Sequence, residues 1–216
     1  KEIKEKLALA RNRSSANIHF HIGATNSNHS NLAQIASQGC PEEGLKAEDI
    51  AGIKVFMGSS TGNMLVNDEE SLKELFSIKE KPILVHCEDE DTIKRNLQAA
   101  KEKYGDDIPF EEHKNIRSRM ACIKSTIKAL ELAMKYQTRL VLCHISTMEE
   151  VEMARAAKLN NPEIIAETSC NYLWFSDEAY SRLGSRIKCN PSVKSDSDRQ
   201  ALRNALRDGH IDIIGS

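Results

Sequence analysis

The stretch GIKVFMGSSTGNM, residues 52–64, begins as a short apolar run and ends in small, glycine-rich residues. This pattern predicts a buried strand followed by a loop. Amphipathic segments with helical periodicity separate it from further runs of the same kind. Strands that alternate with helices favour a parallel sheet with right-handed crossovers. The predicted strands are residues 17–23, 52–57, 82–88, 139–146, 163–169 and 211–216.

Length and charge limit the kind of protein that this sequence encodes. With 216 residues the chain is long enough for one domain, or for most of a larger α/β domain. Its formal net charge is −2, and acidic and basic residues are interspersed. There is thus no basic stripe for nucleic acid and no polybasic patch for a membrane surface. We therefore expect a small-molecule substrate, and no nucleic-acid or membrane partner.

Three further features favour a cytoplasmic protein. No run approaches the roughly 20 apolar residues of a membrane span. The first residues, KEIKEKLALARNRSS, are charged and helical in pattern rather than signal-like. The six cysteines form no CxxC pair and no dense framework, so free thiols in a reducing compartment are expected.

Three polar side chains stand where active sites are built in parallel α/β folds. Lys54, His86 and His144 occur at or near the C-terminal ends of apolar strand runs. In a (β/α)8 barrel, catalytic residues come from that end of several strands. Two histidines and one further donor suit zinc, and a hydrolytic site leaves a position open for water. A lysine amine, with an unperturbed pKa near 10.4, is a poor ligand at neutral pH, so Lys54 requires a chemical change to serve as one.

The pattern alone leaves other interpretations open. Lys54 also fits an edge residue that extends its amine to solvent, and His86 and His144 fit core hydrogen bonding as well as function. Cys87 and Cys143 adjoin these histidines. Because adjacent strand residues face opposite sides, we expect both thiols to point toward the helices and to pack in the core. The acidic EDEDT after His86 is expected to cap a helix rather than to bind a cation.

Six stretches resemble the amidohydrolase superfamily, and within it the hydantoinase-like dihydroorotases that carry a carboxylated lysine. They follow the family's order and cover nearly the whole chain. The resemblance implies a metal-dependent hydrolase with an α/β fold, the (β/α)8 TIM barrel. The stretches are GIKVFMGSSTGNMLV, KPILVHCEDEDTI, RLVLCHIST, IIAETSCNYLWF, RIKCNPSVKSDSDRQAL and DGHIDIIGS.

The resemblance also implies a set of metal ligands. The family's strand-four lysine falls on Lys54, where reaction with CO2 gives a carbamate that bridges two divalent metal ions, expected to be Zn²⁺. The strand-five and strand-six histidines fall on His86 and His144, which would bind the second metal. Family enzymes attack a cyclic amide carbonyl with a metal-bridging hydroxide, so Lys54 is also assigned to catalysis. A dihydroorotase interconverts N-carbamoyl-L-aspartate and (S)-dihydroorotate in de novo pyrimidine biosynthesis.

Two departures concern ligands that the family has and these residues lack. The strand-one His-x-His, with its substrate-binding arginine, is expected before the first residue given. The strand-eight aspartate is expected directly after IDIIGS. Residues 1–216 are thus expected to form a single, partial TIM-barrel domain that spans strands three to eight. We expect this piece alone to be inactive, to bind metal weakly and to expose sheet edges.

The histidines of NIHFHIG, His19 and His21, invite assignment as the missing His-x-His, because period-two spacing puts both on one face of a strand. The run instead resembles the family's third strand. We therefore interpret the pair as hydrogen-bonded histidines near the barrel mouth and not as metal ligands. Asn26, just beyond, has at most a weak claim on substrate.

Substrate contacts are expected from the NPSVK stretch, which resembles the family's NPP loop. The asparagine of that loop contacts the substrate ring, so Asn190 is the candidate substrate-binding residue. Ser192 stands where a second proline is common, and Asn171 stands where the family often has histidine. GSSTGN, residues 58–63, lacks the lysine of a phosphate-binding loop. Its glycines are expected to let the backbone turn tightly beside the metal site.

Three other functions stay open. An allantoinase or hydantoinase uses the same lysine-bridged metals on other cyclic ureides. A catalytically dead, structural homologue is less consistent with the retention of Lys54, His86 and His144. A barrel enzyme in which Lys54 forms a Schiff base is distinguished by borohydride trapping, because a carbamate leaves no reduced adduct. The resemblance allows a homodimer and leaves the oligomeric state open.

Overall fold

The computed structural model describes residues 2–11, 13–58 and 64–215. Its centre is a six-stranded parallel sheet whose strands lie side by side in chain order. Five of the six predicted strand runs contain one of these strands, and the run 52–57 overlaps β2, which begins two residues earlier, so the prediction of a parallel α/β sheet is confirmed. The strands are β1 (Phe20–Gly23), β2 (Ile50–Phe56), β3 (Ile83–His86), β4 (Leu140–Leu142), β5 (Ile164–Ser169) and β6 (Ile213–Gly215).

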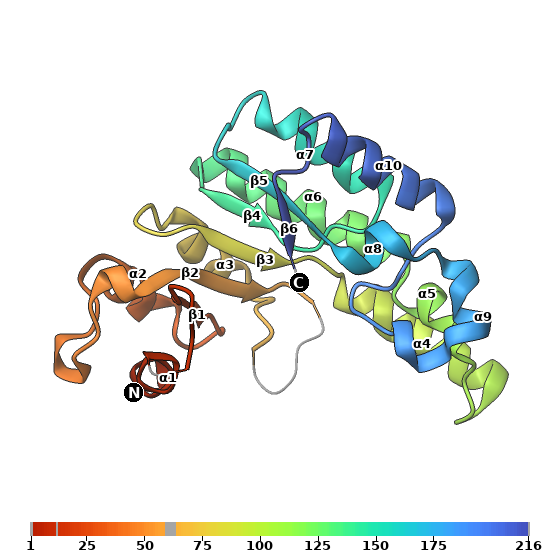
Figure 1. The fold of residues 1–216 in the computed structure, drawn as a ribbon, viewed down its shortest axis with the longest axis horizontal. Helices are drawn as coiled ribbons and strands as arrows, with labels where there is room; N and C mark the ends of the chain where they lie inside the picture. The colour runs from red at the N-terminus through yellow and green to blue at the C-terminus, as the bar shows by residue number, and fades with distance from the viewer. Residues whose placement is uncertain (1, 12, 59–63, 216) are drawn as a thin grey trace.

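Helices follow the strands and cover the outer face of the curled sheet, where α6, α7 and α10 run side by side (Figure 1). The α-helices are α1 (Glu2–Arg11), α2 (His29–Gln38), α3 (Glu69–Ser77), α4 (Glu90–Tyr104), α5 (His113–Ile116), α6 (Arg119–Tyr136), α7 (Met148–Lys158), α8 (Cys170–Trp174), α9 (Tyr180–Leu183) and α10 (Asp196–Arg207). Short 3-10 helices are η1 (Pro41–Glu43), η2 (Ala47–Asp49), η3 (Phe110–Glu112), η4 (Asp177–Ala179) and η5 (Gly184–Ile187).

The strand register explains how the core forms. Ile53, Ile83, Leu140 and Ile164 are aligned across β2 to β5, and each is at most 1% exposed. These side chains face the helices, because they share one buried cluster with helix residues such as Leu75 of α3 and Ala129 of α6. Residues one step further along each strand face the other side of the sheet. The row therefore forms the apolar layer between sheet and helices, and the next row, which includes Lys54, faces the interior of the curl.

Helix starts use the acidic residues that the sequence places there. Asp68 caps α3 by accepting a hydrogen bond from the backbone N–H of Ser71 at 2.8 Å. Asp89, in the EDEDT segment, caps α4 through the backbone N–H of Thr92 at 3.0 Å. The expected capping role of this acidic segment is confirmed. Such caps satisfy N–H groups that have no partner inside the helix.

Within the described residues, β1 and β6 each pair with a strand on one side only. The sheet is therefore an open, curled arc of a barrel, as expected for a partial TIM-barrel domain. In the same part of the chain, no helix combines the length and the apolar character that crossing a bilayer requires.

Candidate functional site

The structure brings the two predicted histidine ligands together at the carboxyl edge of the sheet. His86 is the last residue of β3, and His144 lies two residues beyond the end of β4. The Nδ1 atom of His86 lies 3.1 Å from the Nε2 atom of His144. The ring centroids are 4.8 Å apart, with the planes at 71°. Each ring therefore directs one nitrogen toward the other ring. These two nitrogens are the atoms that would bind a shared metal ion.

Lys54 lies on the neighbouring strand β2, on the inner face of the sheet. Its Nζ atom is 5.3 Å from the centroid of the Phe56 ring, which lies two residues further along the same face. Burial, together with the charges of His86 and Lys54, holds the pKa of His144 well below its usual value. Lys54 thus lies on the inner face of the sheet, within electrostatic reach of His144.

The thiol of Cys143 lies on the inner face, where we predicted the opposite. Burial raises its pKa, and both Lys54 and Glu167 interact with it. The prediction was wrong because alternation from Leu140, which faces the helices, puts Cys143 on the inner face, and it breaks only at the next residue, His144. His144 instead has a φ of 42°, in the left-handed region. This turn lets the side chain of His144 also approach the inside of the sheet.

The thiol of Cys87 behaves as predicted. It is 4% exposed. Burial, and then the negative charge of Glu150 in α7, raises its pKa. Cys87 therefore points toward the helix layer and packs in the core.

Glu167 of β5 was not identified from the sequence. Burial raises the pKa of its carboxyl group, while the charge of Lys54 and a hydrogen bond with Cys143 act in the opposite direction. The signal was present, because Glu167 is an acidic residue near the C-terminal end of an apolar run, which is the argument that selected Lys54. Its position adds a carboxyl group to the inner face beside the predicted ligands.

A second carboxylate, also missed, holds one of the histidines. The Nε2 atom of His86 lies 2.9 Å from Oε2 of Glu88, and Nη1 of Arg117 contacts the same oxygen. Glu88 is fully buried. Burial raises its pKa, but the hydrogen bond from His86 and the charge of Arg117 outweigh that effect and lower it overall. Because Arg117 lies outside every strand, only the tertiary structure reveals this contact.

The predicted hydrogen bonding of the NIHFHIG histidines is confirmed for one of them. The Nδ1 atom of His19 lies 3.2 Å from the carbonyl oxygen of Glu48. His19 precedes β1 and so lies at the amino end of that strand, away from the barrel mouth, which corrects the predicted location. Burial and the charge of Lys54 lower the pKa of His21. The prediction that the two histidines are not ligands stays a prediction.

Asn26 has a structural role that accounts for its position. Its amide donates a hydrogen bond to Oδ1 of Asn67 at 2.9 Å, and its Oδ1 accepts from the backbone N–H groups of Asn67 and Asp68 at 3.3 Å. The side chain therefore joins the loop after β1 to the start of α3.

The loop of the candidate substrate-binding residue Asn190 is fixed by its neighbours. Tyr172 donates to the carbonyl oxygen of Pro191 at 2.7 Å, and Ser192 donates to the carbonyl oxygen of Arg117 at 2.8 Å. Asn190 itself is exposed, as is Asn171 in α8. No contact within the described residues joins Asn190 to the histidine pair, so its assignment to substrate stays a prediction.

The glycine-rich segment after β2 lies largely outside the described residues, because residues 59–63 are not among them. Gly58 is described, and a Cβ atom there would lie 1.8 Å from the carbonyl oxygen of Glu88. The backbone just after β2 therefore approaches the loop after β3 so closely that only glycine fits. The tight turn expected of this segment falls largely outside the described residues, so it stays a prediction.

The donor atoms fit one metal ion held by two imidazoles. Two nitrogens each bound to a tetrahedral zinc at about 2.0–2.1 Å are roughly 3.3 Å apart. The corresponding nitrogens of His86 and His144 are 3.1 Å apart. Nδ1 of His144 is buried without a hydrogen-bond partner among the described residues. The same described residues contain no cluster of three or more His, Cys, Asp and Glu side chains arranged for a metal, so the two histidines alone would supply only part of a metal shell.

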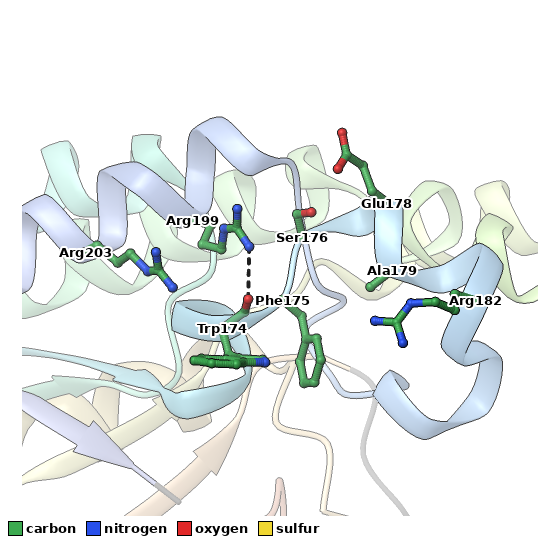
Figure 2. A pocket seen from close by; sticks show the side chains of 8 residues that line it. All are labelled: Trp174, Phe175, Ser176, Glu178, Ala179, Arg182, Arg199 and Arg203. Carbon is green, nitrogen blue, oxygen red and sulfur yellow. Dashed lines mark hydrogen bonds between the residues drawn. The ribbon is translucent and has the colours of Figure 1, made fainter.

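A separate surface pocket of about 520 Å³ lies beside α8, α9 and α10 (Figure 2). Arg199 lines it and donates from Nη1 to the carbonyl oxygen of Trp174 at 3.0 Å. The predicted metal ligands do not line this pocket, so it is distinct from the histidine site. Its lining residues are Trp174, Phe175, Ser176, Glu178, Ala179, Arg182, Arg199 and Arg203.

Comparison with known proteins gives relatives over the whole chain. No protein-family model matches. A dihydroorotase of Methanosarcina acetivorans is 31% identical over the entire chain, which covers 45% of that protein. An allantoinase of Desulfitobacterium hafniense is 26% identical over 98% of the chain and 45% of its own length. The chain thus spans about half the length of the curated relatives that it matches.

Solved structures show the same fold. The L-hydantoinase (dihydropyrimidinase) of Arthrobacter aurescens has a TM-score of 0.84 at 22% identity, over 99% of this chain and 46% of that one. A dihydroorotase of Campylobacter jejuni has a TM-score of 0.63 at 15% identity, over 100% of this chain and 56% of that one. At these identities the similarity concerns the fold alone.

Proposed function

Since the chain is a relative of the dihydroorotases, allantoinases and hydantoinases and spans about half of their length, we propose that it carries part of the active site of a metal-dependent cyclic amide hydrolase. The observation that carries this proposal is the pair of facing ring nitrogens, Nδ1 of His86 and Nε2 of His144, 3.1 Å apart at the carboxyl edge of a parallel sheet. Active sites of TIM-barrel enzymes are built at that edge.

The third ligand in this proposal is Lys54, carboxylated by CO2. An amine with a pKa near 10.4 is cationic at neutral pH and repels metal ions, whereas a carbamate is anionic and offers two oxygens. Support for this role comes from the position of Lys54 on the inner face, within electrostatic reach of His144. The carbamate would bridge two divalent ions, which we propose are Zn²⁺. Zinc supplies a Lewis acid and a water that is deprotonated near neutral pH.

The proposed reaction is that of a dihydroorotase, the interconversion of N-carbamoyl-L-aspartate and (S)-dihydroorotate in pyrimidine biosynthesis. The supporting observation is the 31% identity to a dihydroorotase over the entire chain. Within this reaction Asn190 would contact the substrate ring. Its loop is held by Tyr172 and Ser192, so its backbone position is defined even though its side chain is exposed.

The test uses the full-length protein supplied with Zn²⁺ and ¹³C-labelled bicarbonate. We expect bound zinc, a ¹³C carbamate resonance that is absent from the Lys54→Ala variant, and hydrolysis of dihydroorotate. Borohydride treatment is expected to leave Lys54 unmodified, because the proposal involves no imine. A protein that turns over dihydroorotate without zinc and without the carbamate signal would overturn the proposed site.

An allantoinase is the second candidate, since an allantoinase relative is 26% identical over 98% of this chain. Parallel assays with dihydroorotate, allantoin and hydantoin separate the candidates, because all three require the same lysine and histidines but differ in substrate. A preference for allantoin would change the proposed substrate from dihydroorotate to allantoin. The proposed metal ligands would stay the same.

A further inference from the structure

The contacts of Glu88 set it apart from the other acidic residues near the site. Its carboxylate is fully buried. The Oε2 atom accepts hydrogen bonds from Nε2 of His86, at 2.9 Å, and from Nη1 of Arg117. Removing a charge from water costs several kcal/mol unless it is paired and hydrogen-bonded. Arg117 supplies the paired charge and His86 supplies a second hydrogen bond. A buried charge is therefore maintained directly behind one of the proposed ligands.

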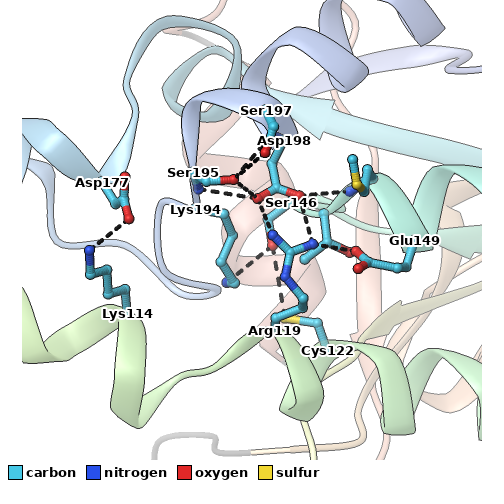
Figure 3. Close-up of polar contacts among 12 residues, drawn as sticks. Lys114, Arg119, Cys122, Ser146, Glu149, Asp177, Lys194, Ser195, Ser197 and Asp198 are labelled. Carbon is cyan, nitrogen blue, oxygen red and sulfur yellow. Dashed lines mark hydrogen bonds and ion pairs between the residues drawn. The ribbon is translucent and has the colours of Figure 1, made fainter.

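Arg117 and the loop after it are in turn fixed from a third side. Ser192 donates to the carbonyl oxygen of Arg117 at 2.8 Å, and Lys194 donates to Oγ of Ser192 at 2.9 Å. Lys194 is itself buried and also contacts Ser146, in the loop after His144, at 3.4 Å (Figure 3). The two loops that carry the histidines are thus connected behind the site by a continuous set of hydrogen bonds.

The direction of the bond between His86 and Glu88 determines which ring nitrogen is free. A carboxylate paired with a guanidinium accepts hydrogen bonds and has no proton to give. Nε2 of His86 must then carry the hydrogen, and Nδ1 keeps its lone pair. Nδ1 is the atom that faces His144. A neutral imidazole has one proton, so a ring that turned over, or adopted the other tautomer, would present N–H to that side.

We propose that Glu88, held by Arg117, is a positioning residue that fixes His86 as the Nε2–H tautomer and so directs the Nδ1 lone pair toward the metal position. This inference rests on the proposed metal site and extends it by one residue. Partners of this kind, behind a histidine ligand, typically contribute 10- to 100-fold to metal affinity. A role in folding alone would require the buried charge but not a defined tautomer.

The first test needs no substitution in the protein that is measured. The full-length protein is labelled with ¹⁵N-histidine and freed of metal, and the ring nitrogens of His86 are assigned by comparison with His86→Gln. We expect Nε2 of His86 to carry the proton and Nδ1 to be bare. A His86 ring protonated on Nδ1, or an equal mixture of tautomers, would overturn the proposal whatever the metal affinity.

The second test measures Zn²⁺ affinity by competition with a chelator. Glu88→Gln removes the charge, and its amide can present either its oxygen or its NH2 group to His86, so neither tautomer of His86 is enforced and we expect a 10- to 100-fold loss of affinity. The matched control is Glu149→Gln, because Glu149 also contacts an arginine, Arg119, but lies on the helix side (Figure 3). Its zinc affinity should stay within about twofold of the wild-type value, as expected for an exposed pair.

Equal affinities for Glu88→Gln and Glu149→Gln would overturn the proposal. If Glu88→Gln does not fold, the tautomer of the wild-type protein decides the question. If the wild-type protein binds no zinc at all, the proposed function fails, and the ¹⁵N measurement still tests the role of Glu88. The two failures are therefore distinguishable.

Discussion

Asp198 joins three helices behind the site, and its removal gives the sharpest stability prediction. The carboxylate is 1% exposed. It accepts from Arg119 of α6, from the backbone N–H of Met148 in α7 and from the N–H and hydroxyl groups of Ser195, which precedes α10 (Figure 3). Asp198→Asn keeps the size of the side chain and removes its charge. The helices that cover β4 and β5 would then lose the group that holds their first turns together.

The expected loss is about 2–4 kcal/mol in the free energy of unfolding. Hydrogen bonds to charged groups contribute about 1.5–3 kcal/mol each, and removing one partner of a buried pair costs about 3–5 kcal/mol. The side chain of Arg119 is 33% exposed and keeps Glu149 as a second partner. We therefore expect a smaller loss of unfolding free energy than for a fully buried ion pair. For a unit of this size, each kcal/mol lowers Tm by about 2–4 °C.

The assay is urea unfolding at neutral pH, with Asp196→Asn as the control. Asp196 also lies in the first turn of α10, so both substitutions remove the same interaction with the helix dipole. Asp196 is exposed and pairs only with Arg199 among the described residues, and we expect its loss to cost less than about 1 kcal/mol. Two variants of equal stability would refute the assignment of Asp198 as the connection between the helices.

The same carboxylate predicts a pH dependence. Burial raises the pKa of Asp198, but the bonds from Arg119, Ser195 and Met148 outweigh it and lower the pKa overall. The stabilisation is therefore complete above the unfolded pKa, near 3.9, and is lost as the pH falls through the lower, folded value. The difference between wild type and Asp198→Asn should be constant from about pH 5 upward and should shrink below about pH 4. A difference that grows on acidification would contradict this sign.

Three further predictions concern other parts of the molecule. Lys54→Ala should lower Zn²⁺ affinity by more than the roughly 10- to 100-fold typical of residues behind a ligand, measured by chelator competition. Tyr180→Phe should lower the free energy of unfolding by about 1–3 kcal/mol in urea, because the buried N–H of Val193 loses the phenol oxygen 3.0 Å away. In native protein, iodoacetamide should modify exposed Cys170 and leave buried Cys87, whose pKa burial raises, as mass spectrometry of the labelled peptides would show.

Strand positions were predictable because the relevant signal is local. The run at 52–57 has the apolar composition of a buried strand, and β2 occupies Ile50–Phe56. The boundaries were less accurate where polar residues continue an apolar run. Residues 139–146 were predicted as one strand, whereas β4 ends at Leu142 because the chain turns at His144 with a φ of 42°. Local composition does not encode that turn, since positive φ is uncommon for any residue other than glycine, even though histidine is among those enriched there.

The candidate site was predictable only in part. Lys54, His86 and His144 were found because each is a polar residue at the end of an apolar run, and parallel strands bring such ends together. Glu88 was read only as part of an acidic segment near a helix start, because its partner Arg117 is 29 residues away and belongs to a loop. Contacts between such distant segments depend on the tertiary structure. The residues that support a ligand are therefore harder to predict than the ligand.

The position of Ser192 shows how the candidate substrate loop and the metal site depend on each other. A proline at this position could not bond to Arg117, whereas the serine hydroxyl donates to its carbonyl oxygen at 2.8 Å. Arg117 in turn contacts Glu88, which bonds to His86. A shift of the loop that carries Asn190 would therefore move the backbone of Arg117 and weaken the bond behind His86. The loop and the histidine are thus coupled through these contacts. A change in the loop is therefore expected to alter metal affinity as well as substrate binding.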